Sequence, residues 1–189
     1  YLLEINSRYD GSSRFSEEYK RFGFFPSFSA GWIMSKENFM RNIKWLSLLK
    51  LRASWGTMGN QNIGTYPYIS SVILGSGVFN GNIVSVAAQN TIANRKITWE
   101  STTVKNVGLN AAFLQNKLNI DFDYYEKMTD DILLTLPIPL IVGMSAGVQN
   151  AGSVENKGWD LQISYNDQIG KDFKYGITGV FSDVRNKLI

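Results

Sequence analysis

The sequence predicts an all-β protein, a segment of an antiparallel transmembrane β-barrel with about seven strands, long extracellular loops and short periplasmic turns. Three observations carry this prediction. Apolar and polar residues alternate with period two along most of the chain. Aromatic residues make up 13% of the 189 residues, with 17 glycines and only 4 prolines, which is typical of β structure with glycine-rich turns. Short and long connections alternate between the predicted strands.

Each of the seven predicted strands has one apolar face. In chain order these faces are Tyr1, Leu3, Ile5 and Tyr9; Phe24, Pro26, Phe28, Ala30, Trp32 and Met34; Leu49, Leu51, Ala53 and Trp55; Val107, Leu109, Ala111 and Phe113; Leu118, Ile120, Phe122 and Tyr124; Trp159, Leu161, Ile163 and Tyr165; and Phe173, Tyr175, Ile177 and Phe181. The runs of about 8–11 residues suit a tilted membrane span. Most faces begin or end in an aromatic residue, as interfacial girdles require.

The opposite faces carry charged and amide groups that a dry core would not accept unpaired. We therefore predict that Arg52, Asp121 and Asp123 face a lumen. The residues predicted to face lipid are Leu49, Leu51, Trp55, Phe122, Leu161 and Ile163.

The connections follow a short–long pattern. Residues 115–117 form a predicted tight turn and residues 167–172 a short one, whereas residues 57–102 and 128–157 are long and rich in Gly, Asn and Ser. Short turns on one side of a sheet and long loops on the other are typical of a transmembrane barrel.

Two further elements are expected in the connections. Ser35 could cap a short helix that continues to Trp45. Residues 132–136 could add an eighth strand, but we interpret them as a hairpin extension above the membrane.

The composition excludes several function classes. The chain has no Cys and no His, which removes disulfides, thiolate nucleophiles, Cys/His zinc sites and a Ser-His-Asp triad. We expect no enzyme and no cofactor. A net charge of +3 without a Lys/Arg cluster does not indicate nucleic-acid binding. No apolar run approaches the roughly 18–20 residues of a membrane helix.

Several motifs, in this order, resemble the barrel of the SusC/RagA group of TonB-dependent outer-membrane transporters. They lie at residues 14–15, 21–32, 49–56, 59–64, 97–102, 123–125, 129–134, 150–154 and 156–159. The resemblance implies that residues 1–189 are part of a larger barrel of about 22 strands around a plug. The plug domain and the barrel termini would lie outside this chain.

The resemblance also implies partners and a location. It implies import of an oligosaccharide or peptide solute, a SusD-like surface lipoprotein as lid, and a TonB complex that acts through parts of the protein outside this chain. It places the protein among outer-membrane lipids of a Gram-negative bacterium of the Bacteroidetes type.

Candidate contact residues each have a plainer alternative. Tyr66 and Tyr68 could contact solute or lid, or pack within their loop. Trp99 and Glu100 could stack on and hydrogen-bond a sugar, although Trp in this position is more often an anchor or packing residue. The apolar segment 137–144 could dock on a lid protein or fold against neighbouring loops.

Three alternatives to the importer stay open at this point. Asp121 and Asp123 lie about 7 Å apart along one strand and could suggest glycoside hydrolysis, but cross-strand hydrogen bonding is the stronger interpretation. A self-contained eight-stranded outer-membrane protein would suit the length. A soluble carbohydrate-binding β-sandwich would bury its apolar faces against each other.

Overall fold

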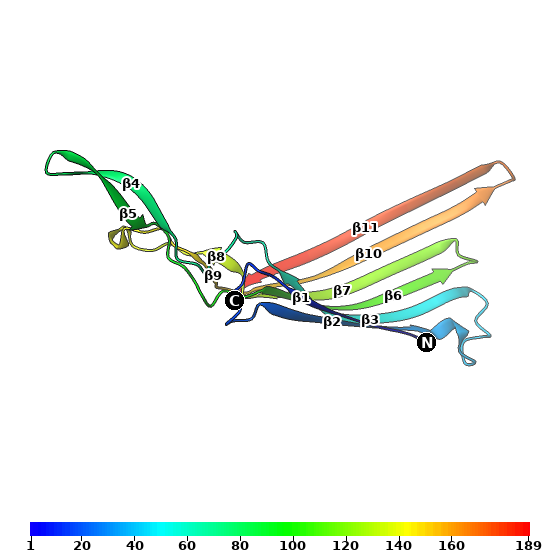
Figure 1. The fold of residues 1–189 in the computed structure, drawn as a ribbon. Coiled ribbons are helices and arrows are strands. Elements are labelled where there is room, and N and C mark those ends of the chain that lie inside the picture. Colours follow the sequence, from blue (N-terminus) through cyan, green and yellow to red (C-terminus); the bar gives the residue numbers. More distant parts are fainter.

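The computed structural model describes residues 1–189 and contains one curved antiparallel sheet of seven strands and two small two-stranded sheets (Figure 1). The strand order in the main sheet is β1-β2-β3-β6-β7-β10-β11. The strands are β1 (Leu2–Gly11), β2 (Phe22–Ile33), β3 (Leu46–Asn60), β6 (Glu100–Phe113), β7 (Leu118–Asp130), β10 (Val154–Ile169) and β11 (Phe173–Leu188). This up-and-down order is that of a barrel wall, and the predicted seven strands are confirmed.

The register places the predicted apolar faces side by side. Leu109 of β6 pairs with Leu51 of β3 and with Phe122 of β7. Leu161 of β10 pairs with Phe122 and with Phe181 of β11. Because side chains alternate along a strand, residues aligned in this way share one face of the sheet. The same register continues through β2 to β1, so one apolar band crosses all seven strands.

The apolar band is the bare face of a single-layered sheet. Leu3 of β1 is 76% exposed and Ile177 of β11 is 71% exposed. No second sheet packs on either face. The β-sandwich alternative is therefore wrong, because it requires two apolar faces in contact.

The strands are longer than the sequence pattern predicts, because they continue beyond the apolar band. β3, β10 and β11 contain 15, 16 and 16 residues. The predicted tight turn between β6 and β7 is confirmed, and its residues Leu114, Gln115 and Asn116 all have positive φ. Residues 170–172 join β10 to β11, so the short connections share one end of the sheet.

The predicted helix from Ser35 to Trp45 is wrong. Only Met34–Lys36 forms a 3-10 turn, without a side-chain cap, and further i→i+3 hydrogen bonds follow it. Phe39 is 67% exposed and Trp45 is 60% exposed. A short amphipathic segment forms a stable helix only when its apolar stripe packs on a partner. Here Phe39 stays exposed, while the Trp45 ring stacks on Phe113 at 5.7 Å and Leu46 already begins β3.

The long connections contain two hairpins. β4 (Val72–Phe79) and β5 (Asn82–Gln89) project far from the main sheet (Figure 1), an element that the sequence analysis missed. β8 (Leu133–Thr135) pairs with β9 (Val148–Asn150) in a separate sheet, which confirms a hairpin extension and not an eighth wall strand. A second 3-10 turn, Leu140–Val142, lies between them. Neither helical turn has the length or apolar character of a membrane-spanning helix.

Candidate functional site at the mouth of the wall

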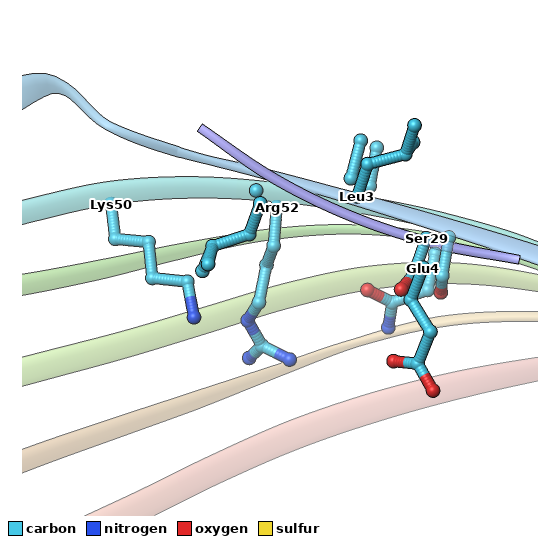
Figure 2. A pocket seen from close by; sticks show the side chains of 11 residues that line it. Leu3, Glu4, Ser29, Lys50 and Arg52 are labelled. Carbon is cyan, nitrogen blue, oxygen red and sulfur yellow. The ribbon is translucent and has the colours of Figure 1, made fainter.

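The polar face of the sheet is hollowed near the end that carries the long connections. A hollow of about 880 Å³ is lined by Glu4, Asn6, Arg8 and Asp10 of β1 together with residues of β2 and β3. A second hollow, of about 620 Å³, adjoins it and shares Glu4. Figure 2 shows that Glu4, Lys50 and Arg52 extend from one side of the sheet while Leu3 extends from the other.

Small side chains make the floor of these hollows. The short residues of the hollow face are Ser27, Ser29 and Gly31 on β2 and Ser54 and Gly56 on β3, while the long side chains of Lys50 and Arg52 rise from the same face of β3. Because the serine and glycine residues are short, the polar side chains of β1 (Glu4, Asn6, Arg8 and Asp10) extend farther from the sheet than the floor beside them. The result is a trough that runs along the strands from the mouth into the wall.

A split between β2 and β3 ends this floor at the mouth. The two strands pair up to Ser27, and the next residue, Pro26, has no N–H to continue the ladder. The ring of Phe25 lies in the split: a Cβ on Gly23 or Gly59 would come within 2.4 or 2.0 Å of it. Both positions therefore need glycine, and Phe25 joins the wall to the loops above.

Those loops contain the only hydrophobic core of the structure. Phe15, Ile63, Ile97 and Trp99 form one buried cluster, with Phe15 and Ile97 fully buried. The four residues come from the connection 12–21 and from both ends of the connection 61–99. Phe25 packs edge-on against Trp99 with ring centroids 5.4 Å apart.

Hydrogen bonds hold the same connections together. The Arg14 guanidinium donates to the carbonyl oxygens of Gln61 and Ile63, at 3.1 and 2.6 Å. The Trp99 indole donates to the carbonyl oxygen of Arg21 at 3.2 Å. Paired backbone groups and a buried core make this part of the mouth a defined structure and not a set of free loops.

The third connection, 131–153, is tied to the second. The Asn150 amide donates to the Thr98 carbonyl oxygen and its oxygen accepts from the Thr98 N–H, both at 2.9 Å. The Glu100 carboxylate accepts from the Leu133 N–H at 3.2 Å. An isolated bridge joins Thr91 to Ser145. We call the three connections 12–21, 61–99 and 131–153 the loop assembly.

Two arms of the loop assembly are free of charge. No Asp, Glu, Lys or Arg occurs from residue 53 to 94 or from 132 to 154. The β4–β5 hairpin exposes Leu74 and Ile83, and the loop at 136–144 exposes Leu140 and Ile141, each by 79% or more. Both arms reach beyond the wall on the same side (Figure 1).

Deeper in the hollow face, an ion pair crosses a glycine. Arg52 and Asp123 lie on either side of Gly108 in the register, and Arg52 Nη2 lies 2.6 Å from Asp123 Oδ2. A Cβ on Gly108 would come within 2.7 Å of both side chains. Beside this pair, the Asn110 amide donates to the Asp121 carboxylate.

Charged residues bound the apolar band at both of its ends. At the loop end of the outer face, Lys157 pairs with Glu155 at 2.7 Å and with Glu126 at 3.6 Å. At the turn end, Lys117 Nζ lies 2.6 Å from Asp167 Oδ1. This hydrogen bond to Asp167 raises the pKa of the Lys117 ammonium, which lies in the β6–β7 turn outside the spanning strands.

The family comparison agrees with this architecture. The family model described as TonB dependent receptor-like, beta-barrel, matches residues 1–187. The chain belongs to this family.

Named relatives of this TonB-dependent receptor segment come from two organisms. TonB-dependent receptor P39 of Formosa agariphila is 37% identical over 189 residues, which cover 100% of this chain and 18% of that protein. TonB-dependent receptor SusC of Bacteroides thetaiotaomicron is 36% identical over 183 residues, which cover 94% of this chain and 18% of SusC. The chain thus spans about a fifth of the length of the curated relatives it matches.

Solved structures give the same assignment. The RagAB peptide transporter superposes with a TM-score of 0.87 at 30% sequence identity, covering 98% of this chain and 20% of that one. The RagAB peptide importer in a "closed-closed" state gives a TM-score of 0.88. This chain is therefore a segment of a SusC/RagA-type TonB-dependent receptor barrel.

The structure places the predicted contact residues of this receptor segment mostly inside the loop assembly. Trp99 is 8% exposed, and the Tyr68 hydroxyl donates to the Ser13 carbonyl oxygen. Glu100 accepts from the Asn60 amide, whereas Tyr66 is 52% exposed. Contact of these four residues with solute or lid stays a prediction.

The two predicted faces can be followed in the register. Arg52, Asp121 and Asp123 lie on the hollow face, and the six residues predicted to face lipid lie on the apolar face. Glu4, Arg8, Asp10 and Lys50, which line the hollows, are not among the predicted site residues. The period-two pattern that assigned their face was the available signal.

Proposed function

We propose that this segment supplies part of the wall and mouth of an outer-membrane importer, driven through TonB, that takes up oligosaccharides or peptides. The observation that carries the proposal is a bare apolar band opposite a hollowed polar face, with charged residues at both ends of the band. Such a band is stable against hydrocarbon, and the polar face suits a water-filled or plugged lumen. Its host would be a Gram-negative bacterium of the Bacteroidetes type.

The segment itself performs no covalent chemistry in this proposal. The polar face guides the solute, and the loop assembly shapes the entrance. Energy for release of the solute would come from the TonB complex, through parts of the protein outside residues 1–189.

The two uncharged arms are proposed to dock on a SusD-like surface lipoprotein. Exposed apolar surface indicates a protein partner when it is extended, and segment 137–144 and the β4–β5 hairpin each expose several large apolar side chains. The buried core beneath the arms fixes their base. The RagAB importer, with "closed-closed" and "open-open" states, is a relative in which opening and closing occur.

The test uses the full-length receptor in its own host. We expect the protein in the outer-membrane fraction, uptake of its solute that stops when TonB is removed, and co-purification of a surface lipoprotein. The double variant Leu140→Asp/Ile141→Asp should lower lipoprotein recovery about tenfold, since charges are placed in an apolar contact. Gln115→Asp, in a turn at the opposite end of the wall, is the control.

Unchanged recovery of the lipoprotein with the double variant would rule out docking through segment 137–144. A receptor found outside the outer membrane would rule out the importer itself.

A further inference from the structure

The outer face carries a row of charged residues at the loop end of the apolar band. Across four neighbouring strands, the register aligns Lys105 of β6, Glu126 of β7, Lys157 of β10 and Arg185 of β11. Lys105 also pairs with Trp55 of β3, which lies on the apolar face, so the whole row faces outward. We call these four residues the charged row, and at the usual strand spacing it extends over about 15 Å.

The cations of the charged row extend farther from the sheet than the anions beside them. Glu126 is shared by two lysines, since its carboxylate oxygens lie 3.9 Å from Lys105 Nζ and 3.6 Å from Lys157 Nζ. The side chains of Lys105 and Lys157 are 60% and 43% exposed, against 32% for Glu126. The outermost layer of the row is therefore cationic, with the carboxylate close to the sheet.

The neighbouring rows repeat this arrangement. Glu155 bonds Lys157 at 2.7 Å and pairs with Lys187 in the register, and Asp183 lies 3.8 Å from Arg185. In both of these ion pairs the cation is again the more exposed partner. Together with the charged row, this patch holds four cations and three anions, so its surplus charge is positive and lies on the outside.

Aromatic residues fix the depth of the charged row in a membrane. Trp55 stacks on Phe28 in the same row, with ring centroids 5.7 Å apart. Tyr124 and Trp159 pair in the next row toward the turn end. Trp and Tyr gather at the level of lipid headgroups, and the long loops of a transmembrane barrel are extracellular. The cations therefore stand among the headgroups of the outer leaflet.

The surroundings of the row are complete in the part that carries the lysines. β6, β7 and β10 each have a neighbouring strand on both sides. Further wall strands join a barrel at the edges of the sheet and do not cover its outer face. Lys105, Glu126 and Lys157 thus keep the same neighbours along the row in a closed wall.

We propose that the charged row binds the phosphate of a phosphorylated glycolipid headgroup in the outer leaflet. The ammonium groups of Lys105 and Lys157 and the guanidinium of Arg185 donate charge-assisted hydrogen bonds to the phosphate oxygens. A broad sugar headgroup suits the length of the row better than the narrow headgroup of a glycerophospholipid. The inference rests on the position of the wall in the outer membrane proposed above, and it is independent of the imported solute.

The experiment uses the purified full-length receptor in a non-ionic detergent. Thermophoresis measures the binding of monophosphoryl lipid A, of the same lipid without its phosphate, and of phosphatidylglycerol, with inorganic phosphate as a competitor. We expect the phosphorylated lipid A to bind about tenfold more tightly than the other two lipids, the effect of one charge-assisted hydrogen bond. Inorganic phosphate should compete only at a large excess over the lipid.

A double variant assigns this preference to the row. Lys105→Gln/Lys157→Gln should weaken binding of monophosphoryl lipid A about twenty-five-fold, about fivefold for each lysine, and leave the dephosphorylated lipid unaffected. Lys127→Gln/Lys44→Gln removes the same charge and is the matched control. Lys127 pairs with Val104, which lines the larger hollow, and Lys44 lies in the β2–β3 connection. Heat-modifiable migration on a gel verifies that both variants are folded.

Four results would overturn the proposal. These are equal binding of lipid A with and without phosphate, equal binding of phosphatidylglycerol, inhibition by inorganic phosphate at the concentration of the lipid, and equal losses in the two folded double variants. A receptor that gives any of these results but still imports its solute with TonB keeps the proposed function. A receptor that binds the lipid but imports nothing keeps the lipid site, so the two failures are distinguishable.

Discussion

The wall and the loop assembly solve the same problem, burial of apolar side chains, in opposite ways. The wall turns its apolar side chains outward in one continuous band, and a single sheet of this kind has no core of its own. The loop assembly turns Phe15, Ile63, Ile97 and Trp99 inward and forms the structure's one hydrophobic cluster. The wall therefore depends on its surroundings, whereas the loop assembly depends on itself.

Because of this difference, the two regions should respond to different kinds of substitution. A charge on the outer face of the wall is penalised by lipid, while the inner face accepts it. A cavity in the loop assembly removes packing that no lipid replaces. The two regions meet at Phe25, which lies in the split between β2 and β3 and packs on Trp99.

The largest effect is expected from Phe15→Ala. Phe15 is fully buried, and truncation of such a ring costs about 3–5 kcal/mol. Because the cluster joins connections 12–21 and 61–99, amide hydrogen exchange should accelerate throughout both, while the wall strands keep their protection. Phe39→Ala, at an exposed position of the turn end, is the control. Equal acceleration in the wall would show that the two regions are not independent.

A smaller effect on folding is expected from Phe122→Arg in the middle of the apolar band. Arg facing the bilayer midplane costs about 2–4 kcal/mol, which should lower the fraction of receptor that folds into vesicles. Gln162→Arg is the matched control, since residue 162 lies on the polar face and pairs with Asp121. If both variants fold equally well, the outer face does not contact lipid.

On the inner face, Gly108→Ala should disrupt the Arg52–Asp123 ion pair without changing the charge of either residue. The new methyl group would stand 2.7 Å from Arg52 Nε and from Asp123 Oδ1 and would push the pair apart. Loss of this charge-assisted contact should cost about 1–3 kcal/mol, measured by denaturant unfolding in detergent. Gly31→Ala, whose nearest contact would be 3.4 Å, should have little effect, and a similar loss there would point to backbone conformation as the cause.

The wall could be predicted from the sequence because side chains alternate between the two faces of a strand, so apolar and polar residues alternate along the chain. The period-two pattern places Leu51, Leu109, Phe122 and Leu161 each on the apolar face of its own strand, and the register aligns these faces. This alternation can be read from neighbouring residues alone. It is sufficient to assign the two faces of the wall, because a face that contacts lipid needs no packing partner from elsewhere in the chain.

The loop assembly could not be predicted in the same way, because its contacts join residues far apart in the sequence. Phe15 meets Trp99 across 84 positions without any repeating pattern. The β4–β5 hairpin was missed although Asn80 and Gly81, both with positive φ, form a dipeptide that indicates a tight hairpin turn. The helix predicted from Ser35 failed because amphipathic spacing says nothing about whether a partner exists.

The smallest effect is expected at the turn end, where Lys117 joins the β6–β7 turn to Asp167 of β10. The hydrogen bond to Asp167 raises the pKa of Lys117 above its ordinary value of 10.5. A raised pKa means that the folded state holds this proton more tightly, so the bond stabilises fully below pH 10.5 and is lost as the pH rises through the raised pKa. Melting of the wild type and Lys117→Met in detergent should therefore differ at pH 8 and converge at strongly alkaline pH. A constant difference across this range would show that Lys117 acts through the packing of its methylene groups, and the turn end would then resemble the loop assembly more than the wall.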